Sequence, residues 1–302
     1  MSRIRKFWYW GLLIWISGTW VIPPVFAGIL VVDDVGMKVA LRQPARRIIS
    51  LAPHVTELLY AAGAGDYVVG AVEYSDYPEQ ARRVPRIGSG AGLDLEKIVG
   101  LHPDLVIAWQ SGNPSWQTAR LKQLGLKIFM TEPRHIEDVA RLIERLGKLA
   151  ATEAAAGKTL REFHRHWKSL QERYTRRAPV TVFYQILDNS LLTVSQEHLI
   201  NDVIQLCGGK NVFSDLPGLT PRVNLESVLE KNPEVVLASG YETLWPQWRD
   251  RWRRWPSLPA TANGNLFFIP PDLIHRNSPR ILQGAEKVCA ALEVARKART
   301  PL

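Results

Sequence analysis

Short apolar runs alternate with longer stretches of helical periodicity along most of the chain. In the first half, the apolar runs have the length of buried strands and lie at 47–52, 67–72, 105–108 and 127–130, with helices predicted at 55–62, 116–124 and 136–149. After residue 179 the alternation resumes, with strands predicted at 180–185, 191–194, 235–238 and 266–269 and helices at 198–206 and 280–296. A small hairpin is expected at 29–41. This alternation indicates the α/β class, with mostly parallel sheets covered on both faces.

A long polar helix is predicted between the two halves. Residues 152–177 lack proline, are rich in Ala, Glu, Lys, Arg and Leu, and carry charges on all sides. Pro179 ends this pattern. The chain is therefore predicted to form an N-terminal α/β lobe at 28–151, a linker helix at 152–178 and a C-terminal α/β lobe at 179–302.

One pattern occurs twice, at 94–108 and again at 224–238. Each copy has a capping Asp or Asn, a short helix with Glu in its first turn, a proline and an apolar run. The distance between the copies is too long for a solenoid repeat and suits two similar lobes. Glu96 and Glu226 take the same place in the two copies. They are either ordinary first-turn residues or a matched pair of exposed acids, one on each lobe.

The N-terminal 27 residues have the pattern of an export signal. Arg3, Arg5 and Lys6 form a basic start, an apolar stretch follows, and Ala27 suits a cleavage site. An uncleaved membrane anchor is the alternative, although the apolar run is shorter than a span needs. There is no Cys near the cleavage point to carry a lipid. We therefore expect a periplasmic protein that is soluble after cleavage of the signal peptide at 1–27.

Charge and motifs exclude several classes of function. The formal net charge is +9, but the arginines are mostly scattered, and export argues against binding to nucleic acid. There is no G-x-S-x-G motif of a hydrolase, and the glycine-rich stretch 88–92 lacks the context of a phosphate loop. His164 and His166 are two residues apart on a helix and point in different directions, so a shared metal is not expected. Neither catalysis nor a cofactor or metal is predicted.

The chain has two cysteines, Cys207 and Cys289. In an oxidising compartment a disulfide between them is the expectation, and the alternative is two separate buried thiols. The bridge would connect the end of one predicted helix to the last helix of the chain.

Four tryptophans share one predicted helical face. Their spacings of three and four residues suit a helix that starts near Pro246, and arginines mostly occupy the other face. Core packing is the simpler interpretation of this face, and an aromatic wall beside a ligand or a membrane-surface helix are the alternatives.

Aromatic and polar side chains follow several predicted strands at their carboxyl ends, where ligands of open α/β sheets bind. A large, flat, amphipathic ligand needs aromatic faces and a few polar groups. The residues that fit this description are His54, Tyr74, Trp109, Asp272, His275 and Arg276.

At these residues the chain resembles the class III periplasmic solute-binding proteins, which carry iron-siderophores, haem and vitamin B12. The resemblance covers nearly the whole mature chain and rests on 48–53 with 56–58, on 93–106 and on 278–281. Three further segments, at 74–78, 107–113 and 207–213, are similar to the corresponding segments of the corrinoid-binding members.

The resemblance implies two lobes joined by one long helix, with the ligand in a cleft between them. It implies that a monomer captures cobalamin or another corrinoid and delivers it to a membrane permease dimer with an ATPase. Glu96 and Glu226 match acids that dock on that permease, and Tyr74 and Trp109 match cleft aromatics. The alternatives are an iron-siderophore or haem as ligand, or an exported α/β enzyme.

The resemblance also assigns the far lobe of the cleft and shows where this chain departs from the pattern. Asp272 and Arg276 match residues that line the far lobe, and Leu192 stands near the place of a cleft Phe. Gly90 and Thr220 stand where corrinoid-binding relatives have Trp, and His54 replaces a small residue. His54 and His275 are expected to hydrogen-bond the ligand or, as the alternative, to reach a ligand metal.

Overall fold

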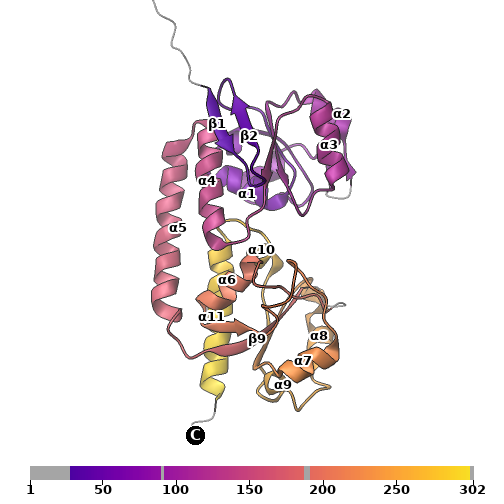
Figure 1. Ribbon diagram of the computed structural model, residues 1–302, viewed down its shortest axis with the longest axis vertical. Coiled ribbons are helices and arrows are strands. Elements are labelled where there is room, and N and C mark those ends of the chain that lie inside the picture. Colours follow the sequence, from indigo (N-terminus) through magenta and orange to yellow (C-terminus); the bar gives the residue numbers. More distant parts are fainter. Residues whose placement is uncertain (1–27, 90–91, 187–190, 300–302) are drawn as a thin grey trace, which may run out of the picture.

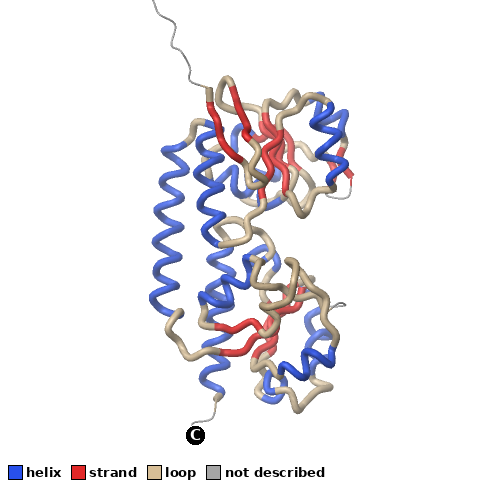
Figure 2. Tube along the Cα trace, viewed as in Figure 1, coloured by secondary structure: helices blue, strands red, loops and turns tan. Residues whose placement is uncertain are grey.

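The computed structural model describes residues 28–89, 92–186 and 191–299. The predicted signal peptide and Gly90 lie outside the described residues. Two α/β lobes lie one above the other in Figure 1, and in Figure 2 the strands of each lobe lie between helices on both sides. The predicted fold class of two α/β lobes is therefore confirmed.

The N-terminal lobe contains a four-stranded parallel sheet in the order β4-β3-β7-β8. Its strands are β3 (Ile48–Ser50), β4 (Val68–Ala71), β7 (Leu105–Trp109) and β8 (Ile128–Thr131). Its helices are α1 (Pro53–Ala61), α2 (Leu95–Gly100), α3 (Ser115–Gln123) and α4 (Ile136–Ala150), with short 3-10 helices η1 (Gly65–Tyr67) and η2 (Glu79–Arg83). Two antiparallel hairpins complete the lobe, β1 (Ile29–Val32) with β2 (Lys38–Leu41) and β5 (Gly88–Ser89) with β6 (Gly92–Leu93).

The C-terminal lobe contains a second parallel sheet in the order β10-β9-β11-β12. Its strands are β9 (Val180–Ile186), β10 (Gly209–Asn211), β11 (Val235–Ser239) and β12 (Leu266–Phe268). Its helices are α6 (Leu199–Leu206), α7 (Leu225–Lys231), α8 (Trp245–Trp252), α9 (Pro259–Ala262), α10 (Pro271–Ile274) and α11 (Ile281–Ala298), with the 3-10 helix η3 (Glu242–Leu244).

The strand predicted at 191–194 is wrong. Leu192 makes single bridges with Ile186 and Arg222 instead of joining the sheet. The amide of Thr193 donates to the carbonyl of Pro221 at 2.9 Å, but Pro221 has no amide hydrogen to return. Two further hydrogen bonds, from Val223 to the carbonyl of Leu191 at 2.9 Å and from Ser195 to the carbonyl of Leu219 at 3.1 Å, join the same segments without forming a regular strand.

A single long helix, α5 (Glu153–Tyr174), runs along both lobes beside α4 and α11 (Figure 1). It is mostly solvent-facing, and it buries Ala156, Phe163 and Leu170 against the rest of the molecule. One continuous hydrophobic core extends along this side of both sheets and includes residues of α1, α4, α6 and α11. This shared core packs against both sheets and therefore joins the two lobes.

Each sheet has a separate core on its other face. In the N-terminal lobe this core lies under α2 and α3, and in the C-terminal lobe it lies under α7 and α8. Trp248 and Trp252 of α8 are buried there, and their indole nitrogens donate to Oε1 of Gln185 at 2.7 and 3.2 Å. The core interpretation of the tryptophan face is therefore confirmed for these two residues, whereas Trp255 lies beyond the helix and is exposed.

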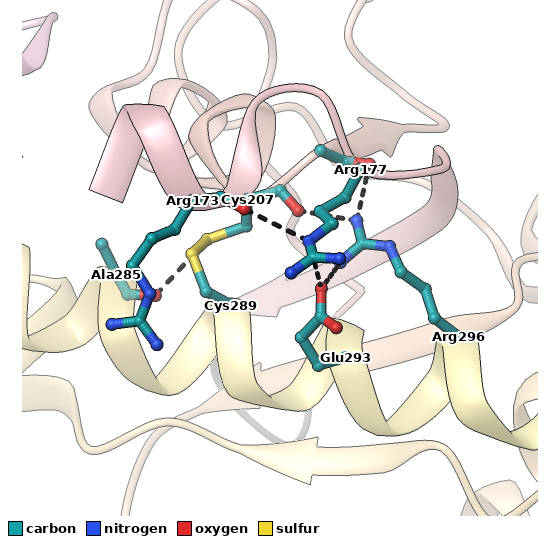
Figure 3. The surroundings of a disulfide bond; sticks show 8 residues. Arg173, Arg177, Cys207, Ala285, Cys289, Glu293 and Arg296 are labelled. Atoms are coloured by element: carbon teal, nitrogen blue, oxygen red, sulfur yellow. Dashed lines mark hydrogen bonds and ion pairs between the residues drawn. A yellow bond between two sulfur atoms is a disulfide. The ribbon is translucent and has the colours of Figure 1, made fainter. Parts of the chain in front are cut away.

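The predicted disulfide is confirmed. Cys207 at the end of α6 is bonded to Cys289 of α11, and both are fully buried (Figure 3). Arg296 of α11 donates to the carbonyl oxygen of Cys207 at 2.7 Å and to Glu293 at 2.7 Å. The bridge therefore ties the edge helix of the C-terminal lobe to the helix that ends the chain.

Replacing both cysteines by serine should lower the free energy of unfolding by about 2–5 kcal/mol, because the bridge closes a long loop in the unfolded chain. The sequence separation is 82 residues. Urea unfolding of the wild type with and without reductant, and of the double variant, measures the effect. A change below about 1 kcal/mol would show that the bridge contributes little to stability.

Candidate functional site

The two lobes meet where the loops after the strands of the N-terminal sheet approach α10 and the start of α11. The side-chain amide of Asn277 donates to the carbonyl of Pro133 at 3.2 Å, and Arg276 contacts Asp76 at 2.7 Å. These contacts join residues that are far apart in sequence. Residues of the loops after β4 and β8 therefore lie against residues that follow α10, at the junction of the two lobes.

Among the aromatic side chains of the site, that of Trp109 is the one held most firmly by its neighbours. It ends β7 and is half-buried, and its amide donates to Oδ1 of Asn113 at 2.7 Å, while Asn113 donates to the carbonyl of Leu51 at 2.9 Å. A Cβ atom at Gly112 would lie only 1.8 Å from Cε3 of Trp109, so any larger residue would displace the indole. The His54 ring packs edge-on at 4.9 Å. These neighbours fix one orientation of the indole before any ligand arrives.

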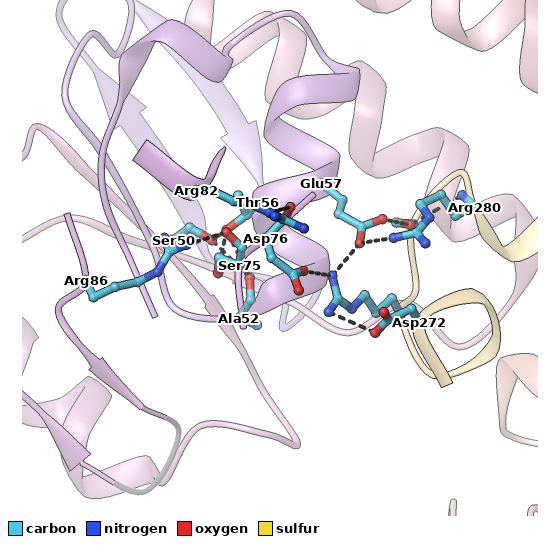
Figure 4. A network of polar contacts seen from close by, with 12 residues as sticks. Ser50, Ala52, Thr56, Glu57, Ser75, Asp76, Arg82, Arg86, Asp272 and Arg280 are labelled. Carbon is cyan, nitrogen blue, oxygen red and sulfur yellow. Dashed lines mark hydrogen bonds and ion pairs between the residues drawn. The ribbon is translucent and has the colours of Figure 1, made fainter. Parts of the chain in front are cut away.

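Tyr74 presents its ring to solvent. Its side chain is 75% exposed, and its backbone φ of 63° is unusual for a residue with a side chain. The next residue, Ser75, is fully buried and hydrogen-bonds Thr56, which also donates to Ser50 (Figure 4). The buried hydroxyl cluster anchors the loop, so that Tyr74 can project without packing of its own.

His54 is placed behind Trp109 instead of at an open surface. It is only 3% exposed, and burial together with the charge of Arg276 lowers its pKa to about 3. Its Nε2 has no hydrogen-bond partner among the residues that the structure describes. The predicted contact between His54 and a ligand stays a prediction.

The far-lobe residues Leu192 and His275 are both half-buried. Nε2 of His275 lies 3.0 Å from the hydroxyl of Tyr184, and burial lowers the pKa of His275 to about 4. The imidazole is therefore neutral at physiological pH. Its ligand role, like that of Leu192, stays a prediction.

A polar network joins the lobes at the base of this junction (Figure 4). Arg276 contacts Glu57 at 2.9 Å and Asp76 at 2.7 Å from the N-terminal lobe. It also contacts Asp272 of its own lobe at 2.9 Å. Arg280 lies 3.1 Å from the same Glu57 oxygen. The two predicted residues Asp272 and Arg276 are therefore brought together, and they belong to an inter-lobe cluster.

Arg276 favours the ionised form of the Asp76 carboxyl. Burial alone would raise the pKa of Asp76, but the hydrogen bond and positive charge of Arg276 outweigh it and lower this pKa below its usual value. Asp76 is therefore a carboxylate at neutral pH.

Glu96 and Glu226 occupy matching exposed positions. Each lies in the first turn of a short helix, α2 or α7. Asp94 accepts from the amide of Lys97 at 2.9 Å, and Asn224 caps α7 in the same way. Figure 1 shows α2 and α7 on the same side of the molecule, away from α5. The repeated pattern thus produces two equivalent acidic sites on one side of the protein.

Three candidate residues were not identified from the sequence. Glu57 and Asp76 lie within the segments used for the resemblance, but their shared arginine is about two hundred positions away in the chain. Tyr241 is 74% exposed just after β11, as Tyr74 is after β4. An aromatic residue that follows a predicted strand was the signal that could have identified it.

Among the residues that the structure describes, no cluster of three or more His, Cys, Asp or Glu side chains is arranged to hold a metal ion. No described helix is both long and apolar enough to cross a membrane.

The sequence matches the family model described as periplasmic binding protein over residues 48–273. It is 38% identical over 255 residues to a vitamin B12-binding protein of Vibrio cholerae, which covers 84% of this chain and 91% of the relative. A vitamin B12-binding protein of Yersinia pestis is 36% identical over 247 residues, 82% of this chain and 86% of the relative.

Solved structures have the same architecture. The crystal structure of the periplasmic vitamin B12 binding protein BtuF of Vibrio cholerae matches with a TM-score of 0.78 and 38% identity, over 84% of this chain and 99% of that one. The periplasmic heme binding protein HutB of Vibrio cholerae matches with a TM-score of 0.71 and 22% identity, over 82% and 98% of the two chains. The second likeness shows the fold alone.

Proposed function

The chain belongs to the periplasmic binding protein family, and from that premise we propose that it captures cobalamin for an ABC importer. The observation that carries this proposal is the 38% identity to a vitamin B12-binding protein over 84% of the chain, together with the same fold. Haem and iron-siderophores are the alternative ligands, and only the shared fold supports them. We propose a binding role without catalysis, which is supported by the names of the same relatives as binding proteins.

The corrinoid would lie between the lobes. Trp109, held in one orientation, and the exposed Tyr74 offer flat apolar faces to a corrin ring from the N-terminal lobe. From the C-terminal lobe we propose contacts with Leu192, Asp272, His275 and Arg276. His54 would contribute mainly through the position of Trp109.

We propose that Glu96 and Glu226 take part in delivering the ligand to the permease. Glu96 and Glu226 are exposed at equivalent places of the two lobes, which suits a permease dimer with two-fold symmetry. We propose that each carboxylate pairs with a basic side chain of one permease subunit, and that the ATPase of the importer acts behind that dimer. Oppositely charged pairs mainly set orientation and encounter rate.

We place the protein in the periplasm, as a soluble monomer after removal of residues 1–27. The basic start, the short apolar stretch and Ala27 support a cleaved signal. The disulfide is consistent with folding in an oxidising compartment.

The visible spectrum of protein purified from the periplasm of a host fed cobalamin, haem precursors or ferric siderophore tests the ligand assignment. We expect corrinoid absorption to co-purify in the first case, and to be strongly reduced in the variant Trp109→Ala. A haem Soret band without corrinoid absorption in hosts given both would contradict the assignment.

A further inference from the structure

One helix on the surface of the C-terminal lobe, α8, is both basic and aromatic. Between Trp245 and Trp255 the chain has four arginines and one aspartate. Trp248 and Trp252 are buried in the core of the lobe, so the arginines lie on the sides and the outer face of the helix. Trp255 follows the helix and is 37% exposed. The outer face of α8 therefore presents positive charge, with an accessible indole next to its end.

Part of this positive charge has no carboxylate partner among the residues that the structure describes. Arg253 contacts Asp250 at 3.1 Å, and both side chains are exposed. Arg254 is exposed and forms no ion pair with a described residue. Arg249 is half-buried, and its Nε has no hydrogen-bond partner there. An exposed surface with an excess of guanidinium groups attracts an anionic partner.

The N-terminal lobe has a similar arrangement on α3. This helix connects β7 to β8, as α8 and α9 connect β11 to β12, so α3 and α8 take equivalent places in the two lobes. Residues 109–127 include three basic side chains and no acidic one. Arg120 and Lys122 are exposed in the last turn of α3, and Trp116 in its first turn is 63% exposed. Each lobe thus carries a basic helix with an exposed tryptophan in it or next to it.

Both basic helices lie beside the helices that carry the acidic pair. The outer core of the N-terminal lobe includes residues of α2 and α3, and that of the C-terminal lobe includes residues of α7 and α8. In Figure 1 all four helices lie on the side of the molecule away from α5. The side that presents Glu96 and Glu226 therefore also presents basic and aromatic groups in both lobes.

We propose that α8 with Trp255, together with α3, binds the anionic phospholipid headgroups of a membrane surface. Guanidinium groups bind phosphate through paired hydrogen bonds, and tryptophan favours the headgroup level of a bilayer. The inference goes beyond the capture and delivery of a ligand, and it does not depend on which ligand the protein carries. Such binding is reversible and raises the concentration of the protein at the membrane that holds its permease.

Flotation of the protein without residues 1–27 on vesicles that lack the permease tests the proposal. At about 50 mM salt we expect at least about tenfold stronger binding to phosphatidylcholine vesicles with about 30% phosphatidylglycerol than to vesicles of phosphatidylcholine alone. The binding should weaken as the salt concentration rises, because ions screen exposed charges. Free inorganic phosphate at a few millimolar should not displace the protein, since a single phosphate cannot engage several arginines at once.

Arg253→Gln with Arg254→Gln removes two exposed charges from the end of α8. This double variant should bind the phosphatidylglycerol vesicles about fivefold or more weakly. The matched control is Arg161→Gln with Arg165→Gln, which removes the same charge from exposed positions on α5. The control should stay within about twofold of the wild type, because α5 lies on the other side of the molecule.

The corresponding change on α3 is Arg120→Gln with Lys122→Gln. It should weaken binding to the same vesicles by about fivefold or more, because the proposed surface extends over both lobes. Equal thermal unfolding of all three double variants and the wild type would show that surface charge, and not folding, accounts for the differences.

A fluorescent label reports which side of the protein meets the membrane. Both native cysteines are in the disulfide, so Ser257→Cys supplies a single thiol for a polarity-sensitive dye, at an exposed position next to the end of α8. Its emission should shift to the blue on phosphatidylglycerol vesicles. The same dye on Ser169→Cys, an exposed position of α5, should not shift.

Three results would overturn the proposal. Equal binding to both kinds of vesicle would show that the basic helices do not recognise anionic lipid. An equal loss in the α5 control would show that net charge alone causes the attraction. Binding only to vesicles that contain the permease would assign the basic helices to a protein contact. Each result leaves the ligand assignment untouched, because titration with cyanocobalamin tests that assignment without vesicles.

Discussion

Protein in which Glu96 and Glu226 are both replaced by glutamine should bind cobalamin normally and fail to deliver it. Both carboxylates are exposed, and neither belongs to the inter-lobe junction, so the ligand affinity has no reason to change. Removal of both charges takes away the proposed pairing with the permease dimer. We expect uptake and stimulated ATPase activity in reconstituted vesicles to fall at least about tenfold.

A matched control for this loss is available within the chain. Glu153 is also a first-turn glutamate, at the start of α5, but it lies on the linker helix. Glu153→Gln should leave both binding and uptake at the wild-type level. Undiminished uptake by the double variant would show that Glu96 and Glu226 are ordinary helix-start residues, the simpler interpretation of the repeated pattern.

The folded protein should lose much of its stability between pH 6.5 and pH 4. Burial lowers the pKa of His54 to about 3, and it lowers the pKa values of His198 and His275 to about 4. The unfolded chain binds these protons near pH 6.5, so it holds more protons than the folded protein below that value. The contribution of the three neutral imidazoles to the free energy of unfolding is fully present above about pH 6.5. At pH 5 the free energy of unfolding should be lower by about 2 kcal/mol for each of these histidines.

Urea unfolding at half-unit pH steps measures this dependence. His275→Gln should reduce the slope by about one proton, whereas His164→Gln, a change at an exposed position on α5, should leave the slope as it is. Asp202 acts in the opposite sense, because burial raises its pKa. An unfolding free energy that stays constant from pH 7 to pH 5 would show that the three imidazoles are accessible to protons in the folded protein.

The hydrophobic pattern predicted most of the fold, because buried parallel strands and amphipathic helices produce strong local signals. The repeated pattern correctly located α2 and α7, whose caps are set by Asp94 and Asn224. The segment at 191–194 was mispredicted because its apolar residues suit a strand, while its hydrogen bonds to residues 219–223 do not form a regular strand. That partner segment is distant in sequence, so the local pattern could not reveal the irregular pairing.

The site was less predictable than the fold. The aromatic residues at strand ends follow from topology, and Trp109 lies at such an end. The cluster around Glu57 depends on contacts between residues about two hundred positions apart, and a helical glutamate such as Glu57 looks like a surface residue in the sequence. His54 is likewise buried against Trp109, a residue at the end of β7 that is distant from His54 in the sequence.

Titration calorimetry with cyanocobalamin, hemin and a ferric siderophore tests the central claim most directly. At about 10 μM protein we expect saturable one-to-one binding of cyanocobalamin with a Kd of about 1 μM or lower, and about tenfold weaker binding by Trp109→Ala. Saturable binding of hemin or the siderophore, with no heat from cyanocobalamin, would contradict the corrinoid assignment.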